Sequence, residues 1–101
     1  MEEIYKYSNP QEVYRKAKQY LGKNVIIQFS TKPQKKYQIL NPNTEKWVHF
    51  GQMGYEDFTK HKDLKRRQNY LRRTENMRGN WRENPYSPNN LSRFLLWSSN
   101  G

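Results

Sequence analysis

The sequence of 101 residues contains no cysteine. This absence excludes disulfides, thiolate zinc sites and cysteine nucleophiles, because all three need a thiol. Apolar residues are also scarce, at 33% of the chain against about 45–50% in ordinary soluble domains. No apolar stretch approaches the roughly 18–20 residues of a membrane span, and no basic region followed by an apolar run opens the chain. We therefore expect a protein without a membrane span that is not secreted.

Aromatic residues compensate for the small apolar fraction. The chain has 3 Trp, 8 Tyr and 4 Phe, and each aromatic side chain can bury about 150–250 Å². A length of 101 residues is typical of one domain. We expect a single small α+β domain over residues 1–101, in which residues 98–101 form a polar tail.

The first half of the chain predicts a helix followed by three strands. Asn9 and Pro10 are suited to the start of a helix, and Gly22 is suited to its end. Three runs with alternating apolar residues follow, and short turns rich in Asn and Pro separate them. This pattern is typical of an antiparallel meander, with the helix at 10–21 and the strands at 24–30, 36–40 and 46–50.

The second half predicts a long basic helix and a short apolar one. The long helix should run over about 56–75, with Phe58, Leu64 and Leu71 facing the sheet and the basic side chains on the opposite arc. The segment 78–90 is irregular. Asn90 is suited to cap a last short helix over 91–97. The helices should cover the sheet, because a lone meander cannot hold itself together.

The net charge of +10 indicates a polyanionic partner, most often nucleic acid. Charge is densest from Lys60 to Arg73, where Asp63 is the only acidic residue. Lys and Arg neutralise phosphates and release counterions, although a charge run can also be a solvated helix face. The expected phosphate contacts are Lys62, Lys65, Arg66, Arg72 and Arg73, with Lys35, Lys36 and Lys46 as a second group.

A second candidate site is the face of the predicted sheet. Tyr37, Trp47 and His49 stand beside basic residues, and nucleic-acid bases can stack on such aromatic platforms. Core packing of Tyr37 and Trp47 under a helix is the alternative. The side of the sheet on which His49 and Phe50 lie decides between the two.

The sequence favours a protein that is not an enzyme. It has no phosphate-binding glycine loop, nucleophile elbow or paired-carboxylate motif. Asp57 and His61 are four residues apart, a spacing that can bind a metal, but two ligands without a third make a weak site. Asp57 near a helix start and a locally bonded His61 explain these residues better. We therefore expect no catalytic residue, no metal, no cofactor and no small-molecule substrate.

The apolar end of the chain, residues 94–97, has two equally plausible roles. Phe94, Leu95, Leu96 and Trp97 are too apolar to lie in water unpaired. They either close the core or dock on another protein.

The order of these features resembles a family of short basic proteins of unknown function encoded by giant DNA viruses. The resemblance spans roughly 13–97, and its most specific pieces are "VHFG", "YEDFTKHKD" and the terminal "LLW". It implies a viral protein acting in the virion or in the cytoplasm and viral factory of the infected cell. It brings no known activity and no catalytic residues.

These observations lead to two functional expectations. The first is a non-enzymatic module that binds DNA or RNA through backbone phosphates, in genome packaging or nucleic-acid handling. The second is a minor capsid or virion protein that docks on a larger coat protein through its aromatic faces and its apolar end.

Overall fold

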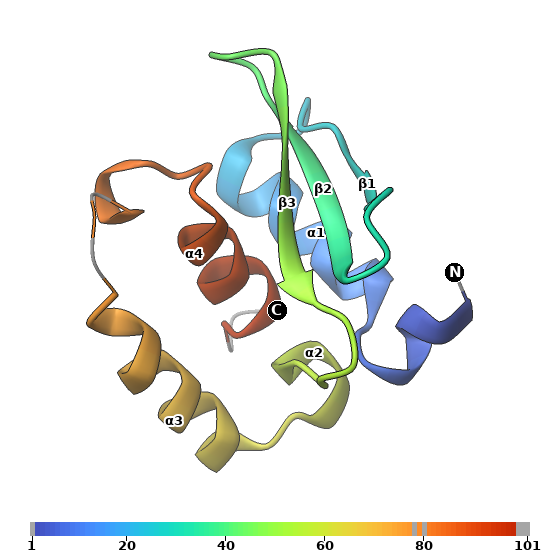
Figure 1. The fold of residues 1–101 in the computed structure, drawn as a ribbon, viewed down its shortest axis with the longest axis vertical. Helices are drawn as coiled ribbons and strands as arrows, with labels where there is room; N and C mark the ends of the chain where they lie inside the picture. Colours follow the sequence, from blue (N-terminus) through green and yellow to red (C-terminus); the bar gives the residue numbers. More distant parts are fainter. Residues whose placement is uncertain (1, 78, 80, 99–101) are drawn as a thin grey trace.

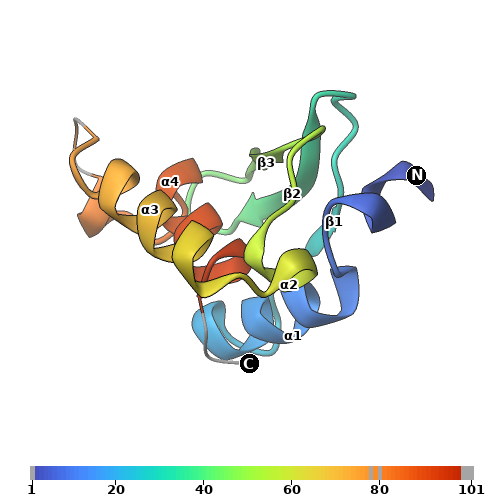
Figure 2. The same ribbon diagram turned by 90° about the horizontal axis from the view of Figure 1, so that it is seen from below.

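The computed structural model describes residues 2–77, 79 and 81–98, and it has the predicted α+β architecture. A three-stranded antiparallel sheet has helix α1 on one face and the C-terminal helix beside its edge strand (Figures 1 and 2). The residues after 98 in the expected polar tail lie outside the described residues. The elements in chain order are α1 (Pro10–Leu21), β1 (Ile27–Phe29), β2 (Lys35–Asn41), β3 (Lys46–Gln52), α2 (Phe58–His61), α3 (Leu64–Glu75) and α4 (Pro88–Leu91), and a 3-10 helix, Glu2–Lys6, precedes them.

Helix α1 has the predicted bounds and covers the sheet. Pro10 occupies its first turn, and Val13 and Ala17 are buried against the sheet. Asn9 has an extended backbone, but its side chain makes no cap hydrogen bond within the described part of the chain. Its N–H instead donates to Thr59 Oγ1 over 2.9 Å.

The sheet register decides which side chains form the core. Tyr37 pairs with Phe50 and Ile39 pairs with Val48, so all four lie on the face that meets α1. Side chains alternate across a sheet, which puts Trp47 and His49 on the other face. β1 is shorter than the sequence predicts, because its first regular pair is Ile27 with Ile39.

The C-terminal helix completes the core. α4 continues into a π-helical turn, Ser92–Leu96, and Leu91, Leu95 and Leu96 are all buried. Leu96 reaches Gly51 so closely that a Cβ there would lie 2.9 Å from Leu96 Cδ1. A side chain at Gly51 would crowd Leu96 and Lys36, and the φ of 78° there is one that residues other than glycine rarely adopt.

The predicted cap of this helix is wrong. Ser87, not Asn90, is the N-cap, and its Oγ accepts from the Asn90 N–H at 3.2 Å. The Asn90 amide instead donates to the backbone oxygens of Trp81 and Asn84. Asn90 therefore holds the preceding loop against the helix that begins at Pro88.

The expected single helix over 56–75 is also wrong, because the chain breaks it in two. Lys62 adopts a left-handed conformation with φ of 56°, and α2 ends there. Asp63 then caps α3, since its Oδ1 accepts from the N–H groups of Lys65 and Arg66 at 3.0 and 3.2 Å. An N-cap carboxylate satisfies amides that have no partner within the helix. Leu64 consequently begins α3 with 65% of its surface exposed instead of facing the sheet.

A buried ion pair joins β2 to the start of α2. The Lys36 ammonium lies 2.9 Å from Asp57 Oδ2, and the two side chains are 2% and 1% exposed. Lys36 also donates to the backbone oxygens of Tyr7 and Tyr55, at 3.3 and 2.6 Å. All three ammonium hydrogens therefore have acceptors. Asp57 also accepts from the Thr59 N–H at 3.0 Å and from the Thr59 hydroxyl.

Replacing Lys36 with alanine should destabilise the fold strongly, because it leaves the Asp57 charge buried and unpaired. Breaking one partner of such a pair costs about 3–5 kcal/mol. Chemical denaturation of Lys36→Ala should show a loss of this order. Lys35→Ala is the matched control, because Lys35 is only partly buried and a surface change usually stays within about 0.5 kcal/mol. Equal losses in the two variants would contradict the structural role of Lys36.

Candidate nucleic-acid interface

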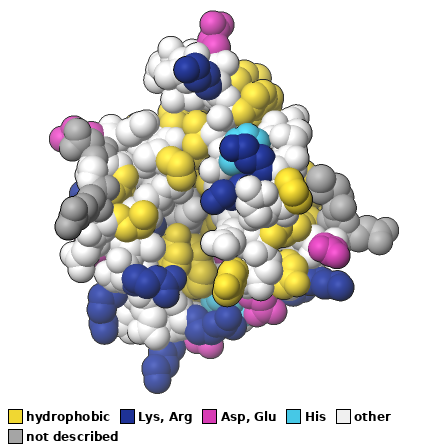
Figure 3. All heavy atoms as spheres, in the orientation of Figure 1, with side chains coloured by type: hydrophobic (Ala, Val, Ile, Leu, Met, Phe, Trp, Pro, Cys, Tyr) yellow, Lys and Arg dark blue, Asp and Glu magenta, His cyan; other side chains and the backbone are white. Residues whose placement is uncertain are grey.

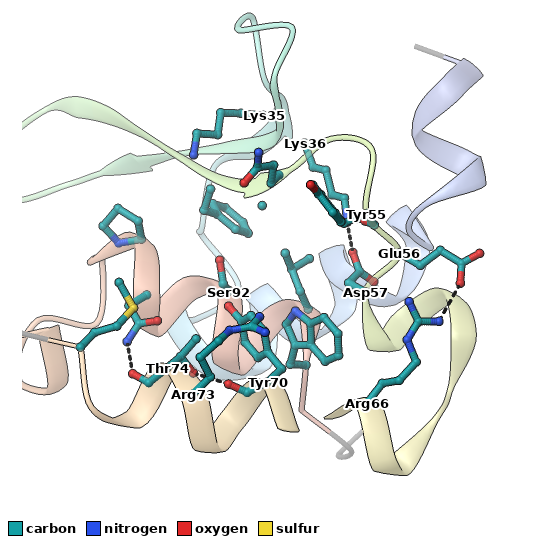
Figure 4. A pocket seen from close by; sticks show the side chains of 18 of the residues that line it. Lys35, Lys36, Tyr55, Glu56, Asp57, Arg66, Tyr70, Arg73, Thr74 and Ser92 are labelled. Atoms are coloured by element: carbon teal, nitrogen blue, oxygen red, sulfur yellow. Dashed lines mark hydrogen bonds and ion pairs between the residues drawn. The ribbon is translucent and has the colours of Figure 1, made fainter. Parts of the chain in front are cut away.

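A cleft separates α3 from the sheet and the C-terminal helix. Its volume is about 610 Å³, and Figure 4 shows side chains from three sides converging on it. The end of β3 and the loop after it form one wall, α3 forms the opposite wall, and the C-terminal helix forms the floor. The side chains that line the cleft include Lys35, Gln52, Tyr55, Glu56, Arg66, Asn69, Tyr70, Arg73 and Trp97.

The cleft carries more positive than negative charge. Arg66 and Arg73 are seven residues apart on α3, which is about two turns, so both lie along its cleft side. Lys35 approaches from the sheet, across the cavity from Arg73 (Figure 4). Of the two acidic side chains that line the cleft, Asp57 is neutralised by Lys36 and Glu56 lies 3.4 Å from Arg66. Within the described residues, Lys35 and Arg73 form no ion pair, and both remain accessible to an anion.

Aromatic rings lie between these charges. Tyr70 stacks on Trp97 at a centroid distance of 4.2 Å and an interplanar angle of 10°. The Arg73 guanidinium lies 5.5 Å from the Tyr70 centroid. Tyr55 is 68% exposed, and its ring is directed into the cavity (Figure 4). The site thus combines cations and rings at one place, as surfaces that bind nucleic acid do.

Sequence reasoning missed the aromatic part of this site. Tyr70 lies four residues after Arg66 and three before Arg73, which on a helix puts it on the same side. That spacing is a usable signal for Tyr70. Tyr55 lies in a loop after Gly54, and no periodicity marks it.

The predicted basic arc is divided by the helix break. Arg66 and Arg73 line the cleft, whereas Lys65 and Arg72, one position earlier in each case, are exposed outside it. Lys62 belongs to a different element, and its ammonium lies 2.5 Å from Glu12 of α1. The five residues therefore do not form one surface.

The second predicted group of basic residues is also divided. Lys35 lines the cleft. Lys36 is 3% exposed and fully engaged, so its prediction as a phosphate contact is wrong. Lys46 begins β3 at the end opposite Gln52, about 20 Å away at 3.3–3.4 Å per residue.

The predicted stacking platform does not exist as a unit. Tyr37 is fully buried on the core face, its hydroxyl donates to Ser8 Oγ over 2.7 Å, and burial raises its pKa. Trp47 and His49 lie on the other face, where Trp47 is 39% exposed. Desolvation, and then the charges of Lys32 and Lys35, lower the pKa of His49. That face therefore has an exposed ring and a neutral imidazole beside cations.

The apolar end closes the core. Leu95 and Leu96 are 0% and 1% exposed, so they are not a docking surface. Phe94 stacks on Tyr20 of α1 at 4.5 Å, and the Trp97 backbone oxygen accepts from Arg67 Nε at 2.7 Å. All four predicted docking residues contact the protein itself.

His61 and Asp57 do not form a metal site with a third ligand. His61 Nδ1 accepts from the Asp63 N–H at 2.9 Å, and its ring lies 5.2 Å from Trp97. Within residues 2–77, 79 and 81–98, no group of three or more His, Cys, Asp or Glu is placed to hold a metal ion. Across the same ranges, no helix is long and apolar enough to cross a membrane.

Comparison with known proteins identifies a family but no function. Residues 25–74 match a family of unknown function (DUF5754). The match runs from just before β1 to the last turn of α3, so it contains both basic walls of the cleft but not its floor. No curated protein and no solved structure matches the chain significantly. A family of unknown function is thus confirmed for this segment, and the viral origin stays a prediction.

Protonation of His61 should destabilise the protein in mild acid. Burial, followed by the charge of Arg66, lowers its pKa in the folded state, and Glu56, Asp57 and Asp63 offset this only in part. The unfolded chain then binds the proton more tightly, so stability rises with pH. The contribution of neutral His61 to the free energy of unfolding is complete above the pKa of the unfolded chain, about 6.5. It is lost as the pH falls through the lower pKa of the folded protein.

Denaturation of the wild type at pH values from about 7.5 to 5 should show this decline, and His61→Gln should flatten it. His49→Gln measures the share of the decline that comes from the other histidine, because the His49 pKa is lowered too. A His61→Gln profile that parallels the wild type would show that His61 contributes nothing.

Proposed function

We propose that this protein is a non-enzymatic module that binds nucleic acid through backbone phosphates, with α3 as its main contact. The observation that carries the proposal is the position of Arg66 and Arg73 on the cleft side of α3, facing Lys35. Arg binds phosphate with two parallel hydrogen bonds, which suits it to this role. The overall charge of +10 adds long-range attraction for a polyanion.

The surface as a whole supports the same ligand class. In the orientation that looks onto the cleft, Lys and Arg side chains lie both over the sheet and over α3, with hydrophobic side chains between them (Figure 3). Lys65 and Arg72 extend the charge beyond the cleft, since both are exposed. A backbone-binding protein needs such a distributed field, because each phosphate contact adds only a modest share of the affinity.

Among the described residues, Glu56 is the one acidic side chain of the cleft that would repel a phosphate near Arg66, and its ion pair with Arg66 is weak. Glu56 and Arg66 lie 3.4 Å apart, and their side chains are 38% and 52% exposed. Ion pairs as exposed as this are worth at most about 1 kcal/mol. A phosphate can therefore replace Glu56 as the partner of Arg66.

The biological setting is part of the proposal. The resemblance to proteins of giant DNA viruses suggests genome packaging or DNA and RNA handling, in the virion or in the cytoplasm of an infected cell. The alternative is a minor capsid protein that docks through its aromatic faces and its apolar end. The burial of Leu95 and Leu96 weakens it, whereas Phe94 at 44% and Trp47 at 39% stay exposed. We therefore favour nucleic acid over a coat protein as the partner.

Removing the positive charge of α3 should abolish most of the binding. The variant Lys65→Ala/Arg66→Ala/Arg72→Ala/Arg73→Ala should bind random-sequence oligonucleotides at least about tenfold more weakly at moderate salt. The plot of log affinity against log salt should also become shallower by about 0.7–0.9 for each lost phosphate contact. Fluorescence anisotropy at a series of salt concentrations measures both quantities.

The control removes the same charge elsewhere. Lys6, Arg15, Lys18 and Lys23 are exposed on or beside α1 and do not line the cleft, so their joint replacement by alanine matches the loss of four charges. This variant should keep most of the affinity and the salt slope. Absence of binding by the wild type at low salt, or equal losses in both variants, would refute the proposal.

Removing the opposing carboxylate should have the reverse effect. Glu56→Gln keeps the shape of the side chain, frees Arg66 and removes repulsion of phosphate. We expect affinity to rise about two- to fivefold, the equivalent of up to about 1 kcal/mol. Glu45→Gln is the control, because Glu45 lies in the turn between β2 and β3. An unchanged affinity in Glu56→Gln would show that no phosphate approaches Arg66.

A further inference from the structure

The basic side chains of α3 point in two directions, and this division bears on the kind of nucleic acid that binds. Arg66 and Arg73 line the cleft on the side of α3 that faces the sheet, although both are also exposed to solvent. Lys65 and Arg72 are exposed and do not line it. The inward pair, Arg66 and Arg73, and the outward pair, Lys65 and Arg72, lie on one helix and carry equal charge.

A duplex can touch the exposed parts of the inward pair at the rim of the cleft, but it cannot enter the cavity. Double-stranded DNA accepts a protruding helix into a major groove about 12 Å wide, but the inward side of α3 faces another part of its own chain. A cavity of about 610 Å³ falls within the 300–1,000 Å³ of small-ligand sites. It therefore has room for about one or two nucleotides of a strand, and a double helix would contact only the rim and the outward pair.

The lining of the cleft matches an unpaired nucleotide. Exposed bases stack on aromatic rings, and Tyr55 offers a ring that is 68% exposed and directed into the cavity. Gln52, Asn69 and Asn89 also line it and supply amide donors and acceptors. In a duplex, the faces of the bases are stacked and their pairing edges are hydrogen-bonded, so neither is available to Tyr55 or to these amides.

The outer face of the sheet carries further cations and a ring near the cleft. On the outer face of the sheet, the side-chain row at the cleft is Lys36 and Gly51, and the next row, by the register, is Gln38 and His49. Lys32 and Lys35 lie close enough to His49 to lower its pKa. The exposed ring of Trp47 lies in the row beyond. Because Lys36 and Gln38 are each only 3% exposed, these groups lie near the cleft without forming a continuous basic track.

We infer that the cleft between α3 and the sheet is a binding site for a single strand of nucleic acid, in which Arg66, Arg73 and Lys35 hold phosphates and Tyr55 stacks on a base. This inference rests on the proposed function and narrows it from nucleic acid in general to unpaired strands. The outward pair of α3 supplies only general attraction.

The test compares the two pairs on two ligands. Arg66→Ala/Arg73→Ala and Lys65→Ala/Arg72→Ala remove equal charge from the same helix. Each is titrated with a fluorescent single strand of about eight nucleotides, within the range of about 4–16 for small single-strand-binding folds, and with a duplex of the same length. Circular dichroism shows whether each variant keeps its helices.

The inward variant should bind the single strand at least about tenfold more weakly, with a salt slope shallower by about 1.4, since each phosphate of a single strand contributes about 0.7. The outward variant should lose less than about threefold on that ligand. The wild type should prefer the single strand to the duplex. Equal losses in the two variants, or a preference for the duplex, would overturn the single-strand site while leaving the proposed function intact. No binding to either ligand would overturn both.

Tyr55 provides a test that does not depend on charge. Tyr55→Ala should weaken single-strand binding about tenfold, whereas Tyr55→Phe should keep it, because stacking needs the ring and not the hydroxyl. Neither change should affect duplex binding or stability, since the side chain is exposed. A mononucleotide that competes as well as the oligonucleotide would instead identify a small-molecule pocket and refute the strand site. Equal binding by Tyr55→Ala and the wild type would refute the stacking contact.

Discussion

The ion pair between Lys36 and Asp57 joins segments that no regular secondary structure connects. From β2, Lys36 reaches the loop before α2 and the backbone of Tyr7, so one ammonium links the sheet, the second half of the chain and the N-terminal segment. Asp57 extends the network through Thr59 to Ser8, whose oxygen lies 3.2 Å from Thr59 Oγ1. Burying two charges is costly unless each is fully hydrogen-bonded, and here they are. The position of the cleft follows, because this network places the loop after β3 opposite α3.

The break at Lys62 and Asp63 determines what the charge of the second half can do. In an unbroken helix the basic side chains would form one arc facing solvent. With the break, α3 restarts in a new direction. Its contacts with the C-terminal segment include a ring stack between Tyr70 and Trp97 and a hydrogen bond from Arg67. Two of its arginines then face the sheet and two cations face outward. This arrangement of the basic side chains of α3 is thus a consequence of the helix start at Asp63.

Most of the fold was predictable because it depends on local patterns. The alternation of apolar residues predicted the three strands, and Pro10 with Gly22 marked α1 at its observed bounds. The break after His61 was not predictable from periodicity, since the apolar spacing of Phe58, Leu64 and Leu71 suits one helix. The break arises from the left-handed conformation of Lys62 and from the N-cap at Asp63. The sequence alone does not distinguish an Asp63 that caps a new helix from an Asp63 inside a continuous one.

The site was predictable only in part. Arg66 and Arg73 stood out by charge, but nothing local distinguished them from Lys65 and Arg72. The roles of Lys36 and Tyr37 depend on partners more than twenty residues away, Asp57 and Ser8 respectively, and neither pairing leaves a mark on neighbouring residues. Lys36 and Tyr37 cannot contact a ligand because they are buried, and their burial depends on the tertiary structure.

The way in which α3 is attached has a consequence for motion. Within the described residues the central apolar cluster takes no member from α3, and Thr74 is the only residue of the helix classed as buried. Its attachments are arginine bonds to backbone oxygens, such as Arg93 to the Leu71 oxygen at 2.7 Å, and stacked rings. Segments with few buried apolar contacts open locally at a free energy well below that of global unfolding. We therefore expect α3 to open locally at a lower free energy than the sheet and α1, which share the central apolar cluster.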